Sequence, residues 1–112
     1  MSGISTHVLD TTKGRPAAGI QVLLERLVPE SGWERAGAGV TDGNGRIARL
    51  LPESQPFDVG LYRITFRTAP YFGQQEAFYP EVTIQFHVSD PASHYHVPLL
   101  LSPYGYTTYR GS

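Results

Sequence analysis

The chain of 112 residues contains no cysteine, one methionine and a single lysine, Lys13. Without cysteine it can form no disulfide, no thiolate-bound zinc or iron–sulfur centre, and no thiol nucleophile. With one lysine, a Schiff-base mechanism would rest on Lys13 alone. Thiol and thiolate chemistry are therefore excluded.

Net charge and long hydrophobic runs are also lacking. Nine basic and ten acidic residues give a net charge of −1, which supplies no field to attract nucleic acid or an anionic membrane. No apolar run approaches the ~20 residues that a membrane span needs. Residues 1–5 lack the basic and then apolar pattern of a signal peptide, and Ser112 does not end a peroxisomal tripeptide. We therefore expect a cytoplasmic protein with neither a nucleic-acid nor a membrane partner.

Turn-forming and aromatic residues, by contrast, are abundant, with 12 glycines, 9 prolines, 5 phenylalanines, 7 tyrosines and 1 tryptophan. Alternating apolar and polar residues predict short strands separated by turns. The expected strands cover residues 6–9, 20–28, 33–41, 46–51, 61–67, 81–88, 94–101 and 104–110. Residues 68–80 hold the only candidate for a helical turn. This pattern predicts an all-β fold, a single domain over residues 1–112 that forms an antiparallel β-sandwich.

Two of these segments give the sharpest local predictions. Residues 42–45, Asp-Gly-Asn-Gly, tolerate positive φ angles, so we expect a hairpin with residues 46–51 as its return strand. In residues 81–88, four apolar side chains alternate with four polar ones, which predicts a half-buried strand. The apolar members are Val82, Ile84, Phe86 and Val88.

The last expected strand, residues 104–110, is unusual for a sheet edge. It contains no lysine or acidic residue and only one charge, Arg110, and three leucines at 99–101 precede it. Exposed edges normally carry charges that block association, so this strand indicates a surface that a second subunit covers. The alternative is that its tyrosines pack into the chain's own core. A homo-oligomer also suits a chain this short, which has little room for a pocket inside one subunit.

The four histidines are His7, His87, His94 and His96. His94 and His96 stand two apart on an expected strand and so share a face, where they could begin a metal site with His7 as third ligand. Neutral imidazoles could instead act in acid–base catalysis, or the histidines could simply be solvated. Arg46 follows the turn at 42–45 and could hold an anion or a developing oxyanion, or be an ordinary exposed arginine.

Several motifs carry a resemblance to a known family. His-Val-Leu-Asp-Thr at 7–11, Gly-Arg-Pro-Ala at 14–17 and Thr-Asp-Gly-Asn-Gly-Arg at 41–46 resemble the transthyretin-related family. Phe-Tyr-Pro at 78–80, the run from His94 to Pro103 and the ending Tyr-Arg-Gly-Ser at 109–112 resemble its enzymatic branch, the 5-hydroxyisourate hydrolases. The hormone-carrying transthyretins of the family lack that ending and the catalytic histidines.

The resemblance implies a transthyretin-like (prealbumin-like) sandwich of two four-stranded sheets, with a short helix near residues 68–73. It implies a homotetramer whose active sites lie in a tunnel at the dimer–dimer interface. The implied reaction belongs to urate degradation. Water attacks the C6 carbonyl of 5-hydroxyisourate and opens the six-membered ring, giving 2-oxo-4-hydroxy-4-carboxy-5-ureidoimidazoline. A transthyretin-like carrier of a small aromatic ligand, without catalysis, is the alternative.

The resemblance also assigns residues and excludes cofactors. The implied catalytic groups are His7, Arg46, His96 and Ser112, the last acting through its hydroxyl or terminal carboxylate. The implied substrate-binding residues are His7, Arg46, Tyr109, Arg110 and Gly111. His94 belongs to a motif but is not implied as a principal catalytic group, and His87 matches nothing functional. Neither a metal nor a cofactor is implied, and which histidine is the base stays open.

Overall fold

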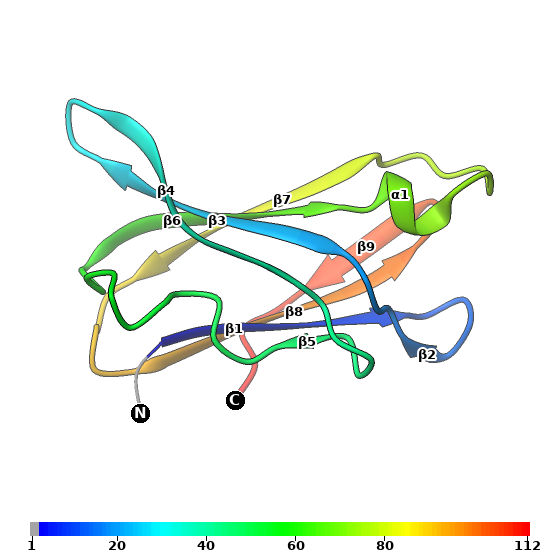
Figure 1. Cartoon of the computed structure of the whole chain (residues 1–112), viewed down its shortest axis with the longest axis horizontal. Coiled ribbons are helices and arrows are strands. Elements are labelled where there is room, and N and C mark those ends of the chain that lie inside the picture. The colour runs from blue at the N-terminus through cyan, green and yellow to red at the C-terminus, as the bar shows by residue number, and fades with distance from the viewer. Residues whose placement is uncertain (1–2) are drawn as a thin grey trace.

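The computed structural model describes residues 3–112 as two β-sheets packed face to face, with one short helix (Figure 1). The lower layer in that view follows the order β2-β1-β8-β9, with β5 attached to β1, and the upper layer follows β4-β3-β6-β7. The strands are β1 (Gly3–Asp10), β2 (Arg15–Pro16), β3 (Gln21–Val28), β4 (Gly32–Val40), β5 (Arg46–Ile47), β6 (Gly60–Arg67), β7 (Glu81–Val88), β8 (His94–Ser102) and β9 (Gly105–Thr108). The prediction of an all-β, transthyretin-like sandwich with two four-strand layers is confirmed.

The core lies between the layers because each long strand turns alternate apolar residues inward. On β7, Val82 and Val88 are buried and Ile84 and Phe86 are half-buried, while the polar residues between them are exposed, as the alternation predicts. Burial of these residues is the main favourable term for the fold. The largest fully buried side chains include Tyr62, Phe66, Ile4, Ile20, Leu24, Leu50, Ile64 and Leu99.

One strand pairing departs from the antiparallel arrangement that the sequence predicted, because it is parallel. β1 and β8 run side by side in the same direction from Gly3 opposite His94 to Asp10 opposite Leu101, and all other pairs between strands are antiparallel. A parallel pair needs a long crossover between its strands. Here almost the whole domain forms that crossover, which is why the alternation of single strands could not reveal it.

The prediction that residues 42–45 form a hairpin turn with residues 46–51 as its return strand is wrong. The return strand shrinks to β5, Arg46–Ile47, and it pairs with β1 of the other sheet rather than with β4. Asp42 closes the turn itself, because its Oδ1 accepts the backbone N–H groups of Asn44 and Arg46, each at 2.9 Å. Gly45, at φ +75°, then accepts the N–H of Val8 at 2.8 Å, so the chain is tied to β1 as it leaves the turn.

The helical turn expected within residues 68–80 is confirmed as α1, Ala69–Phe72. Tyr71 on this turn donates its hydroxyl to Oδ2 of the buried Asp10 at 2.6 Å, and the amides of Thr12 and Lys13 donate to Oδ1. Burial favours the neutral acid, but these hydrogen bonds outweigh it and lower the pKa of Asp10. Burial and the neighbouring carboxylate raise the pKa of Tyr71 to about 12. Asp10 thus fixes the end of β1 to the helix.

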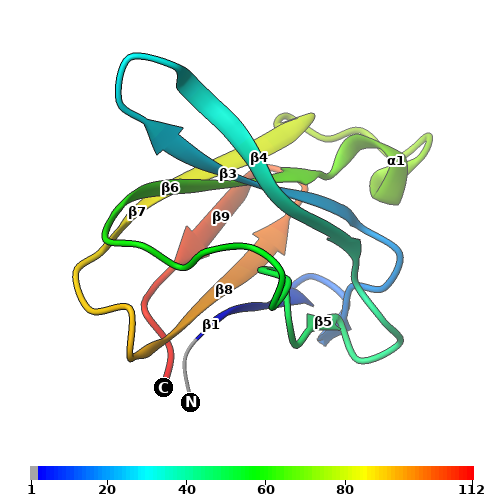
Figure 2. The same cartoon turned by 60° about the vertical axis from the view of Figure 1, so that its left-hand side comes forward.

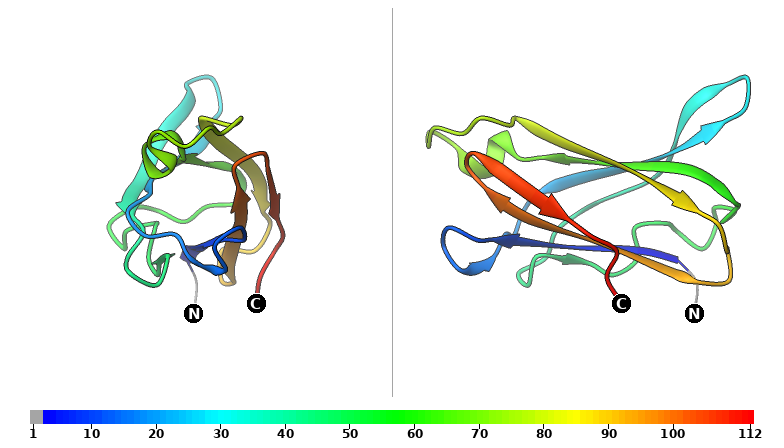
Figure 3. Two further views of the ribbon diagram at one scale, coloured as in Figure 1. Left: turned by 90° about the vertical axis from the view of Figure 1, so that its right-hand side faces the viewer. Right: turned by 180° about the vertical axis from the view of Figure 1, so that it is seen from behind.

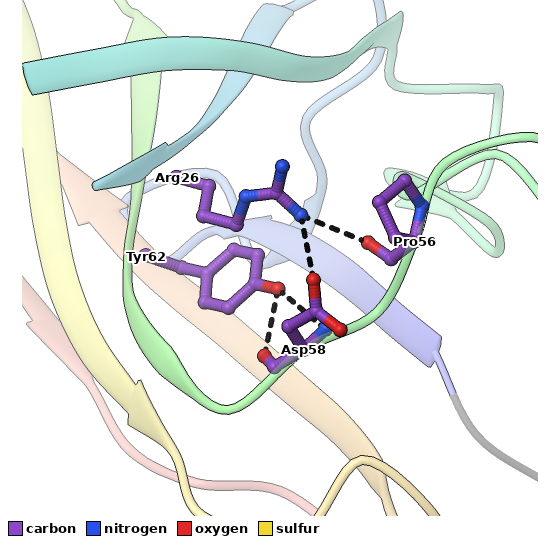
Figure 4. Close-up of polar contacts among 4 residues, drawn as sticks. All are labelled: Arg26, Pro56, Asp58 and Tyr62. Carbon is purple, nitrogen blue, oxygen red and sulfur yellow. Dashed lines mark hydrogen bonds and ion pairs between the residues drawn. The ribbon is translucent and has the colours of Figure 1, made fainter. Parts of the chain in front are cut away.

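At the opposite end of the sandwich, polar contacts hold the long loop after β5 (Figure 4). Arg26 of β3 donates to the Pro56 carbonyl at 3.2 Å and pairs with Asp58 at 3.5 Å. The hydroxyl of the buried Tyr62 donates to the Asp58 carbonyl at 2.9 Å and accepts its N–H at 3.2 Å. The loop is therefore attached to both β3 and β6.

The edge predicted for the last strand is confirmed, since β9 ends its sheet (Figure 3). Its tyrosines do not pack into the chain's own core: Tyr104 is 62% exposed, Tyr106 41% and Tyr109 56%. β9 lies on the same side of the sandwich as β7, and the chain then runs back along β8 toward the start of β1 (Figures 2 and 3). β9 itself carries no charged residue, although the hydroxyl of Tyr104 just before it donates to Glu76.

No helix within residues 3–112 is long and apolar enough to cross a membrane. The sequence expectation about residues 1–5, that they carry no signal peptide, falls partly outside the described residues. The same holds for the outermost part of the predicted domain, since residues 1 and 2 are not described.

Replacement of Tyr71 by phenylalanine should lower the free energy of unfolding by about 1–3 kcal/mol, because it leaves one oxygen of the buried Asp10 without its donor. Urea unfolding measures the change. Tyr104→Phe is the matched control: it also removes a hydroxyl bonded to a carboxylate, that of Glu76, but both groups are exposed. The control should change stability by less than about 0.5 kcal/mol. Equal losses in the two variants would contradict the anchoring role of Asp10.

Candidate functional site

The site is built on the outer face of the sheet that contains β1 and β8. Because successive residues of a strand point to opposite faces, Ser5 and His7 of β1 share a face, as do His94 and His96 of β8. The register places Ser5 directly beside His96. Residues that face the other way, such as Val8 and Val97, are buried in the core. The polar groups are thus held on a rigid, packed sheet.

Arg46 lies on this face because it belongs to β5, the short strand that was predicted to pair with β4 but pairs with β1. β5 pairs with β1 so that Arg46 stands opposite His7. Side chains of directly opposed residues lie on the same face of a sheet. The backbone N–H of Arg46 is bonded to Asp42, whose pKa this bond and that from Asn44 lower. The tight turn therefore fixes the backbone from which the guanidinium projects.

These residues surround a shallow depression of about 270 Å³. Its lining includes Ser5, Arg46, His94, His96 and Ser112. The structure thus brings together three of the four residues that the family resemblance implies as catalytic, and His7 stands beside Arg46 in the next position of β1 on this face. Within one copy the depression is open to the outside of the sheet.

Gly111 holds His96 from the C-terminal side. Its N–H donates to the His96 carbonyl at 2.8 Å, and the two residues form an isolated bridge beyond β9. A methyl group at Gly111 would lie 2.5 Å from Cδ2 of the His96 ring and 3.3 Å from Pro98. Only glycine leaves room for the imidazole here, so the backbone of Gly111 packs against the ring.

Tyr109 and Arg110 are not brought into the depression around Arg46. The Arg110 guanidinium stacks 4.4 Å from the ring centroid of Tyr95, a core residue on the opposite face of β8 from His96. Tyr109 is more than half exposed and lines a second hollow of about 240 Å³ on the β7 side, together with Arg110 and His96. In a single copy these two residues therefore share a hollow with His96 but not with Arg46.

His96 is poised to be neutral near pH 7. Burial lowers its pKa below the 6.5 of an ordinary histidine, and the positive charge of Arg46 and the neighbouring His7 and His94 lower it further. A hydrogen bond from Ser5 acts in the opposite direction and is outweighed. A neutral imidazole has one nitrogen with a lone pair and one with an N–H, so His96 can either accept a proton from a ligand or donate one to it.

Two residues of the site were not singled out from the sequence. Ser5 Oγ lies 2.7 Å from Nε2 of His94 and 2.8 Å from Nδ1 of His96, so Ser5 links both histidines. Alternation along β1 could have placed Ser5 on the same face as His7, because they are two residues apart. Its position beside the histidine pair could not be found, since that depends on the parallel register.

The three histidines His7, His94 and His96, considered above as possible metal ligands, are not arranged as a metal site. Within residues 3–112, no three histidine or carboxylate side chains converge in a way that could hold a metal ion. Two of the imidazole nitrogens instead share the single hydroxyl of Ser5.

Known proteins resemble this chain over nearly its whole length. A 5-hydroxyisourate hydrolase of Salmonella dublin is 47% identical over 111 residues, covering 97% of this chain and 80% of the relative. A solved structure of Klebsiella pneumoniae 5-hydroxyisourate hydrolase superposes with a TM-score of 0.84 at 37% identity, covering all of both chains. Transthyretin from Sparus aurata superposes with a TM-score of 0.89 at 32% identity, covering 99% of this chain and 97% of the other.

The family model described as HIUase/Transthyretin matches residues 4–111, from the second residue of β1 to the glycine beside His96. The match therefore includes β1 and β8, the strands that carry the histidines of the site, and the turn that leads into Arg46. On these comparisons and this fold, the chain belongs to the HIUase/transthyretin family.

Proposed function

We propose that this protein is a 5-hydroxyisourate hydrolase, which opens the six-membered ring of the product of urate oxidation. The observation that carries the proposal is the outer-face cluster of His7, Arg46 and His96 on three neighbouring strands. The activity of the Salmonella and Klebsiella relatives supports it. The substrate is small, flat and polar, which suits a shallow depression lined by imidazole, guanidinium and hydroxyl groups.

In the proposed reaction, one neutral imidazole takes a proton from water while the oxygen attacks the C6 carbonyl of the substrate. The bond between C6 and the ring nitrogen then breaks, and that nitrogen receives a proton. Arg46 binds the ring and stabilises the negative charge on the tetrahedral oxygen. His7 and His96 share the acid–base work, and Ser112 orders the site from the end of the described chain.

We further propose that four copies assemble so that each active site lies between two dimers. The open depression and the exposed tyrosines at 104, 106 and 109 support this, because both leave apolar or reactive surface uncovered in a single copy. Tyr109 and Arg110 would then act on a substrate enclosed by a second copy. The expected cytoplasmic location, and the expected absence of nucleic-acid and membrane partners, stay predictions.

A carrier of a small aromatic ligand is the second candidate, because transthyretin from Sparus aurata has the same fold. The histidine and arginine cluster favours the hydrolase, since binding a ligand without chemistry does not require imidazoles beside a guanidinium. The terminal Tyr-Arg-Gly-Ser sequence, which the resemblance assigns to the enzymatic branch, also favours it.

Freshly generated 5-hydroxyisourate should decay much faster with this protein than without it, as followed by its ultraviolet absorbance. His7→Ala and His96→Ala should each lower kcat by about 100-fold or more, the usual contribution of an acid–base group. His87→Ala is the matched control, because His87 is exposed on β7, and it should keep the wild-type rate. Decay at the uncatalysed rate with saturable binding of the substrate would instead establish the carrier.

Gly111→Ala should lower kcat at least 10-fold, because the added methyl displaces the His96 ring. Gly43→Ala is the control, since a methyl there meets no atom within 4 Å, and its activity should match the wild type.

Removal of residues 109–112 should abolish turnover, while sedimentation still shows a folded tetramer. A fully active protein without residues 109–112 would contradict the assignment of this segment to the site.

Arg46→Gln should raise the pKa of His96 toward 6.5, because it removes the positive charge that disfavours protonation of the imidazole. The pKa should stay somewhat below that value, since burial also lowers it. A nuclear magnetic resonance titration of the His96 ring protons measures the change. Arg35→Gln, on an exposed position of β4 in the other sheet, should leave the pKa unchanged. An unaltered His96 pKa in Arg46→Gln would show that the two groups are not close.

A further inference from the structure

The hydroxyl of Ser5 bridges two imidazoles on the outer face of the sheet. Oγ lies 2.7 Å from Nε2 of His94 and 2.8 Å from Nδ1 of His96, and Ser5 is almost fully buried. Both distances are those of good hydrogen bonds. β1 and β8 lie side by side (Figure 2). The bridge depends on their parallel register, which aligns Ser5 with His96.

The hydroxyl has one proton to donate and two lone pairs with which to accept. If it accepted from both rings, its own proton would be left without an acceptor, because Ser5 Oγ has no third partner within residues 3–112. Two arrangements of protons therefore remain when both imidazoles are neutral. In the first, His94 donates Nε2–H to Ser5, and Ser5 donates its own proton to Nδ1 of His96. In the second, His96 donates Nδ1–H to Ser5, and Ser5 donates to Nε2 of His94. The arrangements differ in which nitrogen of each ring carries hydrogen.

The far nitrogen of His94 distinguishes the two arrangements. Nδ1 of His94 is buried and has no hydrogen-bond partner among the described residues. In the second arrangement this nitrogen carries a proton, which buries an N–H donor without an acceptor. In the first it carries only a lone pair. Buried N–H groups without acceptors are rarer in proteins than unpaired acceptors, so the first arrangement is favoured.

The first arrangement fixes the state of His96. Its Nδ1 accepts from Ser5, so the neutral ring carries its proton on Nε2. Nε2 of His96 has no partner within residues 3–112 and is not among the buried atoms, and the ring lines the depression with Arg46. A proton donor therefore faces the position where the ligand binds.

We infer that Ser5 and His94 are positioning residues that hold His96 with its Nε2–H directed at the substrate, so that His96 is the proton donor and His7 the base. This rests on the proposed function and resolves its open choice between the two histidines. His96 would deliver its Nε2 proton to the departing ring nitrogen or donate a hydrogen bond to the oxyanion. His7, beside Arg46 on the same face, would take the proton of the attacking water.

The tautomers are directly measurable by nuclear magnetic resonance of protein labelled with ¹⁵N in histidine, recorded above the pKa of the imidazoles. Nitrogens with and without hydrogen have widely separated shifts. The wild-type protein should show hydrogen on Nε2 and none on Nδ1 in both His94 and His96. Hydrogen on Nδ1 of His96 would overturn the inference. Because this measurement requires no turnover, it stands even if the protein proves inactive toward 5-hydroxyisourate, which would overturn the proposed function instead.

Variants test whether the bridge matters for the reaction. Ser5→Ala should lower kcat about 10-fold or more with a smaller change in KM, and its His96 shifts should move toward those of an exchanging imidazole. Ser5→Thr keeps the hydroxyl and should restore both the shifts and most of kcat. Thr65→Ala, which removes a hydroxyl pair with Thr83 on the other sheet, should leave both unchanged. A Ser5→Ala protein with wild-type shifts and kcat would overturn the inference.

His94 supplies a second, independent pair of variants. His94→Gln retains an N–H donor at similar reach and cannot exchange tautomers, so it should keep the Nε2–H state of His96 and most of kcat. His94→Leu removes the donor and should resemble Ser5→Ala. The inference would be overturned if glutamine and leucine lowered kcat equally while both proteins kept the wild-type melting temperature.

Discussion

The parallel pairing of β1 with β8 is the constraint on which the site depends. These strands are separated by 84 positions along the chain, from Asp10 to His94, yet they align residue by residue. Parallel pairing needs a long connection, and the rest of the sandwich serves as that connection. The register sets Ser5 beside His96. A shift of one residue would turn every functional side chain of β1 into the core, so packing of Ile4 and Val8 inside the sandwich also enforces the site outside it.

A second constraint, the turn at residues 42–45, positions the guanidinium of Arg46. The turn at residues 42–45 is closed by Asp42, and the Gly45 carbonyl is bonded to β1. A two-residue strand is too short to contribute much stability, but it needs only to set one register, that of Arg46 opposite His7. The charge placed there then helps to keep His96 unprotonated. Backbone hydrogen bonds in a turn thus help to place one of the charges that, after burial, lower the pKa of His96.

Local patterns predicted much of the fold, and non-local pairing accounts for what they missed. Alternation located β3, β6 and β7 within about a residue of their observed ends, because burial of one face leaves a period of two in the sequence. The same reasoning failed after Gly45, since a turn signal states that the chain reverses but not which strand it meets. Most of the site residues came from motifs of the family. Ser5 was missed because serine on a strand has no signal of its own until its neighbour across the sheet is known.

The small size of the chain explains where the site lies. A domain of 112 residues has one modest core, and here the inner faces of both sheets form it. Polar groups that must exchange protons would be costly there, since each would need a partner in a low-dielectric interior. The outer face has no such cost, but it leaves the groups open to water. The proposed assembly of four copies would enclose such a site, and the uncharged edge at β9, with its exposed tyrosines, is the surface that this proposal assigns to the contact.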